Sequence, residues 1–455
     1  MFVNSSDVIA ALITPPGRGG VGIVRLSGNN LEPFFKGLLG FTPSPRFAHY
    51  QPFFAADGKP IDRGITLYFP APDSYSGEHV LELQGHGGPV VMDCLLRRAI
   101  ELGARQARPG EFSERAFLNG KMDLTQVEAV ADLINASSEQ AARGAINTLQ
   151  GQFSQQVSQL LEHLIHLRVY VEAAIDFPEE EIDFLSDGKV ESDLRNLSDQ
   201  LNALLAGVTQ GALLSEGISV VIAGKPNAGK SSLLNALSGL DTAIVTDVPG
   251  TTRDILRAQI SIDGMPLHII DTAGLRATQD VVERKGIERA EDEIKRADQV
   301  LFLIDASKPF DLADTAIFPK LEMDIGRLEN FTFVLNKIDA PGYVASQARQ
   351  TKHPVIEISA MTGSGLDELK QHLKRCAGYV NAGEGLFSAR RRHINALTQT
   401  QYNIGLALQQ LLTGRAGELV AEDLKHAQQE LGSITGDFTN EDLLGEIFSG
   451  FCIGK

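Results

Sequence analysis

The spacing of hydrophobic residues predicts a mixed α/β domain over residues 1–120. Short apolar runs with strand character are separated there by breaks that contain Gly and Pro, in the segments VGIVRLSG, GITLYFP and HVLELQG. The run VVMDCLLRRAIEL, which follows the last of them, repeats its apolar residues at helical spacing. We therefore expect strands and a helix in this first domain.

From Leu124 onward, apolar residues recur every three or four positions, which is typical of amphipathic helices. Thr125 and Glu128 have the spacing of a capping box and predict the start of the first helix. Two longer stripes follow, at Phe153, Val157, Leu160, Leu164, Leu167 and Val171, and at Val190, Leu194, Leu197, Leu201 and Leu204. Since such stripes must be buried against other helices, they predict an all-α helical domain whose first part is residues 121–215.

A third pattern occupies residues 216–380. Short apolar strands alternate with helical stretches, in ISVVIAG, PLHIIDTAG, QVLFLID, FTFVLNKID and PVIEISA. This alternation predicts a doubly wound, mainly parallel sheet, and IDGM at 262–265 predicts a hairpin to one antiparallel strand. Helical spacing returns over residues 381–455, which end in the tail CIGK. Because neither helical flank is expected to close a core alone, we predict that the α/β domain is inserted into one helical domain.

Composition narrows the functional classes. The chain has 455 residues and a formal net charge of −17, which argues against a protein that coats nucleic acid through a basic surface. Its three cysteines, Cys94, Cys376 and Cys452, do not have the spacing of metal ligands. No apolar run approaches the ~18 residues of a membrane span, and the N-terminus lacks a secretory signal pattern. We expect a cytoplasmic protein without membrane contact.

The segment GKPNAGKS at 224–231 follows an apolar strand and precedes a helical stretch, which is the context of a P-loop. Gly224 and Gly229 allow the backbone to wrap phosphates, and the helix N-terminus supplies positive potential. We expect Lys230 to reach the β- and γ-phosphates and Ser231 to ligate Mg²⁺. The inserted domain is therefore predicted to be a Ras-like α/β P-loop G domain.

Further elements follow in order and favour GTP over ATP. Asp271 ends the next strand on the Mg²⁺ side, and TDVPGTTRD lies where a first switch belongs, with Thr252 as a second Mg²⁺ ligand. In NKID, Asn336 and Asp339 can read guanine, because a carboxylate accepts from the N1 and 2-amino donors that adenine does not present together. The predicted GTP-binding residues are Asn227, Ala228, Gly229, Lys230, Ser231, Ser232, Thr246, Asp247, Val248, Pro249, Gly250, Thr251, Thr252, Asp271, Thr272, Ala273, Gly274, Asn336, Lys337, Asp339, Ser359, Ala360 and Met361.

A K⁺ ion is predicted beside the phosphates. Asn227 can offer its amide oxygen, Thr246 and Val248 their backbone carbonyls, and Thr251 a further oxygen. Neutral oxygens around a large cavity suit K⁺ better than a small hard cation, and a cation there offsets the negative charge that develops during phosphoryl transfer. The alternative interpretation is that Asn227 only caps the loop.

The segment DTAGLR has Leu275 where signalling GTPases have the glutamine that orients the attacking water. A leucine side chain cannot hold a water molecule, so another group must position it. The segment that follows, DVVERKGIERAEDEI, is rich in carboxylates and offers candidates.

Together, GKPNAGKSSLLNAL, GTTRD, DTAGLR, TPPGRGGVGIVRLSG, LELQGHGGP and the terminal FCIGK make the chain resemble the tRNA uridine-modification GTPases of the MnmE/TrmE family over its whole length. The resemblance implies a folate-binding, dimerising N-terminal domain, a K⁺-dependent GTPase and a homodimer. It also implies an FAD-containing partner subunit in a heterotetramer, and a reduced tetrahydrofolate, in its 5,10-methylene or 5-formyl form, as one-carbon donor. The implied reaction adds an aminomethyl or carboxymethylaminomethyl group to C5 of the wobble uridine of certain tRNAs.

The resemblance also assigns residues. Glu283 is the implied catalytic carboxylate, and Asn227 the implied K⁺ ligand. The implied folate-binding residues are Arg25, Glu82, Lys121 and Lys455. Their chemistry fits, since Glu82 can accept from N–H groups of the pterin and the basic side chains can pair with carboxylates of the donor. Cys452 is a candidate nucleophile for one-carbon transfer.

Some alternatives stay open. A GTPase switch in ribosome assembly, without modification chemistry, would also fit the G domain, but it has no need of a one-carbon donor pocket. The basic run ARRRH at 389–393 is interpreted as a solvated helix start, with tRNA phosphate contact as the alternative. The run DFPEEEIDF at 176–184 is interpreted as an acidic loop rather than a metal site.

Overall fold

The computed structural model describes residues 7–136, 138–176, 188–225, 227–240, 256–262, 265–271, 293–307, 330–341, 343, 353–379, 387–413, 417–437, 444, 447–448, 451 and 454. By their internal contacts the residues fall into two compact units, with 1–131, 148–198 and 396–455 in the first and 132–147 and 199–395 in the second. These divisions run through helices, and the predicted domain boundaries at residues 120, 215 and 380 stay predictions. The acidic run at 176–184 lies almost entirely outside the described residues.

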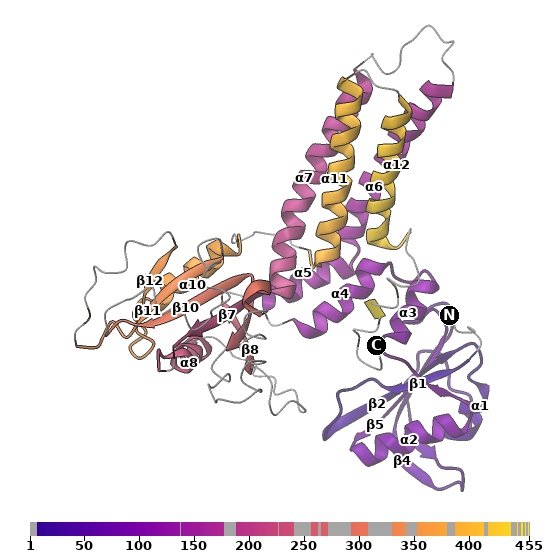
Figure 1. Ribbon diagram of the computed structural model, residues 1–455. Coiled ribbons are helices and arrows are strands. Elements are labelled where there is room, and N and C mark those ends of the chain that lie inside the picture. Colours follow the sequence, from indigo (N-terminus) through magenta and orange to yellow (C-terminus); the bar gives the residue numbers. More distant parts are fainter. Residues whose placement is uncertain are drawn as a thin grey trace, which may run out of the picture. The chain divides into compact units, whose positions relative to one another are not determined.

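The first unit begins with a six-stranded sheet (Figure 1). Its strands are β1 (Ile9–Leu12), β2 (Gly19–Gly28), β3 (His49–Phe54), β4 (Pro60–Phe69), β5 (His79–Gly87) and β6 (Arg105–Gln106). Their order is β3-β4-β5-β2-β1-β6, and all neighbours are antiparallel except β1 and β6. The three predicted strands correspond to β2, β4 and β5. The sequence pattern misses β1, β3 and β6: IAAL shows no alternation with polar residues, β3 has a proline in its interior, and β6 has only two residues.

Helices cover one face of this sheet (Figure 1), while Tyr50 and Ile65 on the other face are exposed. The covering elements are α1 (Glu32–Phe34), the π-helical turn η1 (Phe35–Leu39) and α2 (Pro89–Glu101), the last of which is the predicted helix. Val24 and Leu26 of β2 are fully buried against them. Because side chains alternate along a strand, Arg25 projects from the opposite face, and so does its cross-strand partner Glu82.

Long helices make up most of the rest of the first unit, and α6 packs along α12 (Figure 1). The helices are α3 (Glu111–Leu118), α4 (Leu124–Asn135), α5 (Glu139–Leu149), α6 (Gln152–Asp176), α7 (Lys189–Glu216), α11 (Arg391–Leu412) and α12 (Gly417–Thr435), of which α4, α5, α7 and α11 continue into the second unit. All members of the two predicted apolar stripes are buried, as expected. Within the described segments, no helix combines the length and the low polarity needed to cross a bilayer.

The cap of α4 differs from the predicted one. The carboxylate of Asp123 accepts from the backbone N–H of Gln126 at 3.0 Å, and the Gln126 side chain accepts from the N–H of Asp123 at 3.0 Å. This reciprocal pair is the capping box. The predicted pair, Thr125 and Glu128, lies two residues too late and is buried, and the Thr125 hydroxyl is hydrogen-bonded to Ser154 inside the helical core.

The second unit contains the predicted inserted α/β domain (Figure 1). Its strands and described helices are β7 (Ile218–Gly224), α8 (Lys230–Leu240), β8 (Leu256–Ile262), β9 (Met265–Asp271), β10 (Gln299–Asp305), β11 (Phe331–Asn336), β12 (Val355–Glu357) and α10 (Leu366–Cys376). The strand order is β12-β11-β10-β7-β9-β8, and every pair is parallel except β8 and β9. Ile262 pairs with Met265, so the predicted hairpin is confirmed. The central strands are buried on both faces, which explains their continuous apolar sequences.

Candidate functional site

The loop between β7 and α8 has the backbone of a phosphate-binding loop. Gly224 and Gly229 have φ angles of 141° and 99°, which residues with a side chain rarely adopt. A Cβ atom added at Gly229 would lie 2.2 Å from Nδ2 of Asn336, so there is no room for a larger residue. Lys230, the first residue of α8, is buried and donates to the carbonyls of Gly224 at 2.7 Å and Lys225 at 3.1 Å. Its ammonium group therefore lies against the loop at a helix N-terminus, a position suited to a phosphate.

Asn336, at the end of β11, ties the segments around this loop together. Its Nδ2 donates to the carbonyl of Ala228 at 2.9 Å, and its Oδ1 accepts from the N–H of Ala360 at 3.0 Å. The side chain predicted to read the base is thus engaged by protein groups. Asp339 is exposed, and Met361 is 89% exposed. The predicted roles of Asn336 and Asp339 in reading the base stay predictions.

Lys337 makes a second link to the same loop. Its Nζ donates to the carbonyl of Asn227 at 2.8 Å and to a carboxylate oxygen of Asp305 at 2.7 Å. Asn227 and Lys337 both have left-handed backbones, with φ angles of 67° and 70°. Asp305 is not among the residues predicted from the sequence. The signal that could have found it is a carboxylate at the end of a buried strand adjacent to the NKID strand.

Many predicted nucleotide-site residues lie outside the described residues. They are Thr246, Asp247, Val248, Pro249, Gly250, Thr251, Thr252, Thr272, Ala273, Gly274 and Glu283. The same holds for Cys452 and Lys455 of the tail. Asp271 ends β9 as predicted, but its side chain is not among the described ones. Ser231 and Ser232 are exposed on the first turn of α8, and Ser231 stays a predicted Mg²⁺ ligand.

Two predicted folate-binding residues are neighbours in the first sheet. Arg25 of β2 and Glu82 of β5 are register partners, and the guanidinium donates from Nε at 3.0 Å and Nη2 at 2.8 Å to one carboxylate oxygen. Their side chains are only 17% and 13% exposed. The guanidinium also lies 5.0 Å from the ring centre of Tyr75 and 5.7 Å from that of Phe112. Such a pair fixes the orientation of Glu82 and occupies the guanidinium that was assigned to a carboxylate of the donor.

One loop connects this pair to Lys121. Tyr75, whose ring covers the pair, is followed by Ser76, whose carbonyl accepts from the side chain of Asn119 at 2.8 Å. A Cβ atom added at Gly77 would lie 3.1 Å from Cγ of Lys121. The exposed Lys121 therefore belongs to the same side of the first unit as Arg25 and its partner.

The end of the chain packs onto this unit as well. Gly454 is buried, has a φ of 102°, and would place an added Cβ atom 2.5 Å from the carbonyl oxygen of Leu12. Leu12 pairs in register with Val24, the neighbour of Arg25 on β2. Gly454 therefore lies against the strand next to the one that carries Arg25.

Aromatic residues anchor the segment before Gly454. Phe448 and Phe451 pack against Leu124 and Val127 of α4. Gly110, with a φ of 69°, permits the close approach, since an added Cβ atom there would lie 2.8 Å from the carbonyl oxygen of Phe448. These contacts place Phe448 and Phe451 against α4 and against Gly110.

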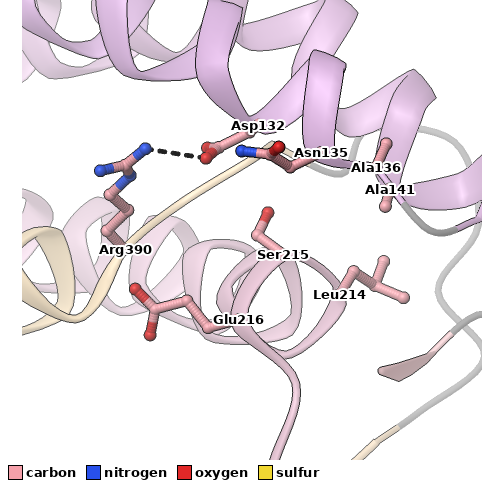
Figure 2. Close-up of a pocket in the computed structure, with 8 residues that line it drawn as sticks. All are labelled: Asp132, Asn135, Ala136, Ala141, Leu214, Ser215, Glu216 and Arg390. Atoms are coloured by element: carbon pink, nitrogen blue, oxygen red, sulfur yellow. Dashed lines mark hydrogen bonds and ion pairs between the residues drawn. The ribbon is translucent and has the colours of Figure 1, made fainter. Parts of the chain in front are cut away.

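A further cavity, of about 280 Å³, lies in the second unit at the point where α7 ends (Figure 2). It is lined by Asp132, Asn135, Ala136, Ala141, Leu214, Ser215, Glu216 and Arg390, none of which is a predicted site residue. Arg390 pairs with Asp132 at 2.9 Å, and Glu216 accepts from the N–H of Arg391 at 3.3 Å. Burial raises the pKa of Glu216 above its usual 4.5, although the Arg391 N–H opposes the shift.

The basic run at 389–393 starts a helix, as predicted, because α11 begins at Arg391. It is only partly solvated. Arg391 is exposed, but Arg390 is held by Asp132, and His393 is buried with its Nδ1 accepting from the N–H of Arg390 at 3.1 Å. The prediction of a solvated run is therefore wrong for Arg390 and His393, whose contacts are internal.

Comparison with known domain families decides between the possible identities. The family described as MnmE helical domain matches residues 124–452, and the family described as GTP-binding protein TrmE N-terminus matches residues 8–121. The chain belongs to the MnmE family of tRNA modification GTPases. The helical-domain match spans the inserted G domain, so the chain has an α/β N-terminal domain and an all-α domain interrupted by a P-loop domain.

Curated relatives agree with this assignment. The tRNA modification GTPase MnmE of Chromohalobacter salexigens is 57% identical over 449 residues, which cover 99% of this chain and 98% of the relative. The protein of the same name from Saccharophagus degradans is 56% identical over 456 residues, and the alignment covers 100% of both chains.

Solved structures with similarity to the chain include two GTPase structures. The G domain of the T. maritima FeoB iron transporter is 26% identical, covers 35% of this chain and 98% of that chain, and has a TM-score of 0.28. Era in complex with MgGDPNP and a segment of 16S ribosomal RNA is 25% identical, covers 48% of this chain and 89% of that chain, and has a TM-score of 0.28.

Proposed function

We propose that the chain is a K⁺-dependent GTP hydrolase that, with an FAD-containing partner subunit, adds an aminomethyl or carboxymethylaminomethyl group to C5 of the wobble uridine of certain tRNAs. Family membership makes it a GTPase of tRNA modification. The proposal adds the cation, the donor, the partner and the modified atom. What supports it is that one chain has both a phosphate loop and an Arg25–Glu82 pair, with Gly454 packed on the neighbouring strand.

In the proposed GTP complex, Lys230 exchanges the carbonyls of its own loop for the β- and γ-phosphates. The N–H groups at the start of α8 add positive potential at the same place. Asp339 accepts from N1 and the 2-amino group of guanine. Asn336 and Lys337 also hold the loops around the base, through their bonds to Ala228 and Asn227.

The proposed cation ligands come from the phosphate loop and the first switch. They are Ser231 and Thr252 for Mg²⁺, and Asn227, Thr246, Val248 and Thr251 for K⁺. Asn227 fits this role because it is exposed at the loop and its left-handed backbone is one that asparagine tolerates better than most residues. A K⁺ ion held by neutral oxygens supplies positive charge next to the phosphoryl oxygens. Glu283 positions the attacking water in place of the glutamine that Leu275 replaces.

In the proposed folate site, Arg25 acts on Glu82 rather than on the donor. Its two hydrogen bonds reach one oxygen of the carboxylate, and the other oxygen accepts only a long bond of 3.5 Å from the Gln84 side chain. The proposal assigns this second oxygen to the pterin N–H groups. Lys121 and Lys455 pair with the carboxylates of the reduced folate. Cys452 remains a candidate nucleophile for the one-carbon transfer.

We propose that the open face of the first sheet forms the homodimer. Tyr50 of β3 and Ile65 of β4 are register partners and are 67% and 38% exposed. Arg63 lies over the Tyr50 ring at 5.3 Å. Ile65 is also the partner of Gln84, which places this apolar pair on the same sheet face as Glu82. A second copy packed here would lie next to the proposed folate site.

Two measurements test this function. Mass analysis of wobble nucleosides from cells lacking the chain should show the loss of the C5 modification, and its return when the gene is restored. Calorimetry should show that the purified chain binds 5-formyltetrahydrofolate. Normal wobble nucleosides together with immature ribosomal subunits, and no folate binding, would instead support the assembly switch.

A further inference from the structure

Asp305 and Lys337 form a polar link between the NKID strand and the phosphate loop. Asp305 ends β10 and is the register partner of Asn336 on β11. One of its carboxylate oxygens accepts from Lys337 at 2.7 Å, and the other accepts from the Ser307 hydroxyl at 2.6 Å. The Asp305 side chain is 18% exposed. Burial opposes ionisation of Asp305, but the hydrogen bonds from Lys337 and Ser307 outweigh it and hold its pKa below the usual value.

Lys337 contacts the phosphate loop as well as Asp305. Its ammonium group donates to the carbonyl oxygen of Asn227 at 2.8 Å, on the residue proposed to ligate K⁺. The next carbonyl, of Ala228, is held by Asn336 at 2.9 Å. Two consecutive loop carbonyls are thus hydrogen-bonded by two consecutive residues, Asn336 at the end of β11 and Lys337 directly after it. Asparagine tolerates the left-handed backbone of Asn227 better than most residues do, but the conformation still costs energy, and these bonds help to hold it.

We propose that Asp305 is a positioning residue for the K⁺ site: it orients the ammonium group of Lys337, which holds the Asn227 carbonyl and so keeps the cation ligand in place. The inference rests on the proposed role of Asn227. It goes beyond that role, because it makes K⁺ affinity depend on a carboxylate that contacts neither the cation nor the nucleotide.

The alternative is that the pair only stabilises the domain. A carboxylate at the other end of the same strand provides a control for this. Asp298, directly before β10, accepts from the backbone N–H of Ser219 at 2.8 Å and from its hydroxyl at 2.7 Å. Asp298→Asn and Asp305→Asn therefore remove the same charge from two ends of one strand, and only the second change reaches the phosphate loop.

The test measures GTP turnover by the full chain as K⁺ replaces Na⁺ at constant ionic strength. For Asp305→Asn, we expect the K⁺ concentration for half-maximal activation to rise about five- to tenfold, with the rate at saturating K⁺ largely restored. Asp298→Asn should leave the K⁺ dependence unchanged. Ser307→Ala, which removes only one of the bonds to Asp305, should produce a smaller shift of about twofold, and it decides the matter if Asp305→Asn does not fold.

The outcomes separate this inference from the proposed function. Equal wild-type rates in K⁺ and Na⁺ would overturn the K⁺ dependence and, with it, the inference. A K⁺-dependent wild type with an unchanged half-activating concentration in Asp305→Asn would overturn the inference alone. The inference also fails if the variant loses affinity for fluorescent GDP while its K⁺ dependence is unchanged, since Asp305 would then serve only the guanine pocket.

Discussion

The phosphate loop and the Arg25–Glu82 site both rely on charged groups aimed at polar partners, yet they are assembled differently. In the phosphate loop, short contiguous motifs meet at strand ends, and Asn336 and Lys337 bind the loop itself through its backbone carbonyls. In the N-terminal site, the paired side chains are 57 residues apart and meet because β2 and β5 are register partners.

This difference determines what each site is sensitive to. A site built from local motifs keeps its geometry as long as its loops fold, so single catalytic groups can be removed without loss of binding. A site built on strand register depends on the sheet, since a slip of one residue would turn Arg25 or Glu82 toward the α2 side. We therefore expect changes in the G domain to separate catalysis from binding, and changes in the N-terminal site to remove binding itself.

The largest expected effect tests whether a change in the G domain can separate catalysis from binding. Glu283→Ala should slow GTP hydrolysis about 100-fold or more while the affinity for GTP stays near normal, because the water loses its positioning group but the phosphate loop is intact. Single-turnover hydrolysis and binding of a fluorescent GTP analogue give the two quantities. Glu288→Ala, in the same acidic segment, should leave both unchanged. Unchanged hydrolysis in Glu283→Ala would show that another group positions the attacking water.

The next effect tests the expectation that changes in the N-terminal site weaken binding itself. Glu82→Gln should lower the affinity for 5-formyltetrahydrofolate about 10- to 100-fold, because a neutral amide replaces the acceptor that Arg25 orients. Calorimetry on the purified chain measures it. Glu32→Gln, at an exposed carboxylate paired with Lys36 in the same domain, should bind normally. Equal affinity in both variants would remove Glu82 from the proposed site.

These two sites also show how far the sequence could be interpreted. The phosphate loop, the NKID strand and the hairpin could be predicted, since each is a local pattern with its own geometry. The pairing of Arg25 with Glu82 could not, because strand register is set by the whole sheet. The predicted capping box, Thr125 and Glu128, lies two residues after the observed one, Asp123 and Gln126. Both pairs have the spacing of a capping box, and the burial of Thr125 and Glu128 rules out the predicted pair. Asp305 was missed because a lone carboxylate at the end of a strand belongs to no sequence motif.

A smaller effect concerns the chain end. Gly454→Ala should reduce tRNA modification about tenfold, because the added Cβ meets the Leu12 carbonyl at 2.5 Å and displaces the tail, while K⁺-stimulated GTP turnover is retained. Gly103→Ala is the matched control, since Gly103 has a φ of 108° and nothing within 4 Å of an added Cβ. Deletion of the last four residues should abolish modification altogether. Modification at the normal rate after that deletion would show that the tail has no part in the reaction.

The smallest effect concerns the cavity at Glu216. The folded state raises the pKa of this carboxyl above 4.5, so it binds a proton more tightly than the unfolded state does. Stability is therefore lost as the pH rises from about 4.5 through the raised value. The groups around it are Arg390, Arg391 and Asp132. Glu216→Gln should raise the unfolding midpoint by about 1–2 °C at pH 7 and by nothing at pH 4, as measured by calorimetry. An equal change at both pH values would contradict the assignment.

The central claim, that a K⁺ ion held by Asn227 replaces the catalytic charge that other GTPases obtain from side chains, has one direct test. GTP turnover by the wild-type chain and by Asn227→Ala is measured in KCl and in NaCl at equal ionic strength. We predict that the wild type is at least about tenfold faster in KCl and that Asn227→Ala is equally slow in both salts. Equal wild-type rates in the two salts, or a K⁺ advantage that survives in Asn227→Ala, would contradict the claim.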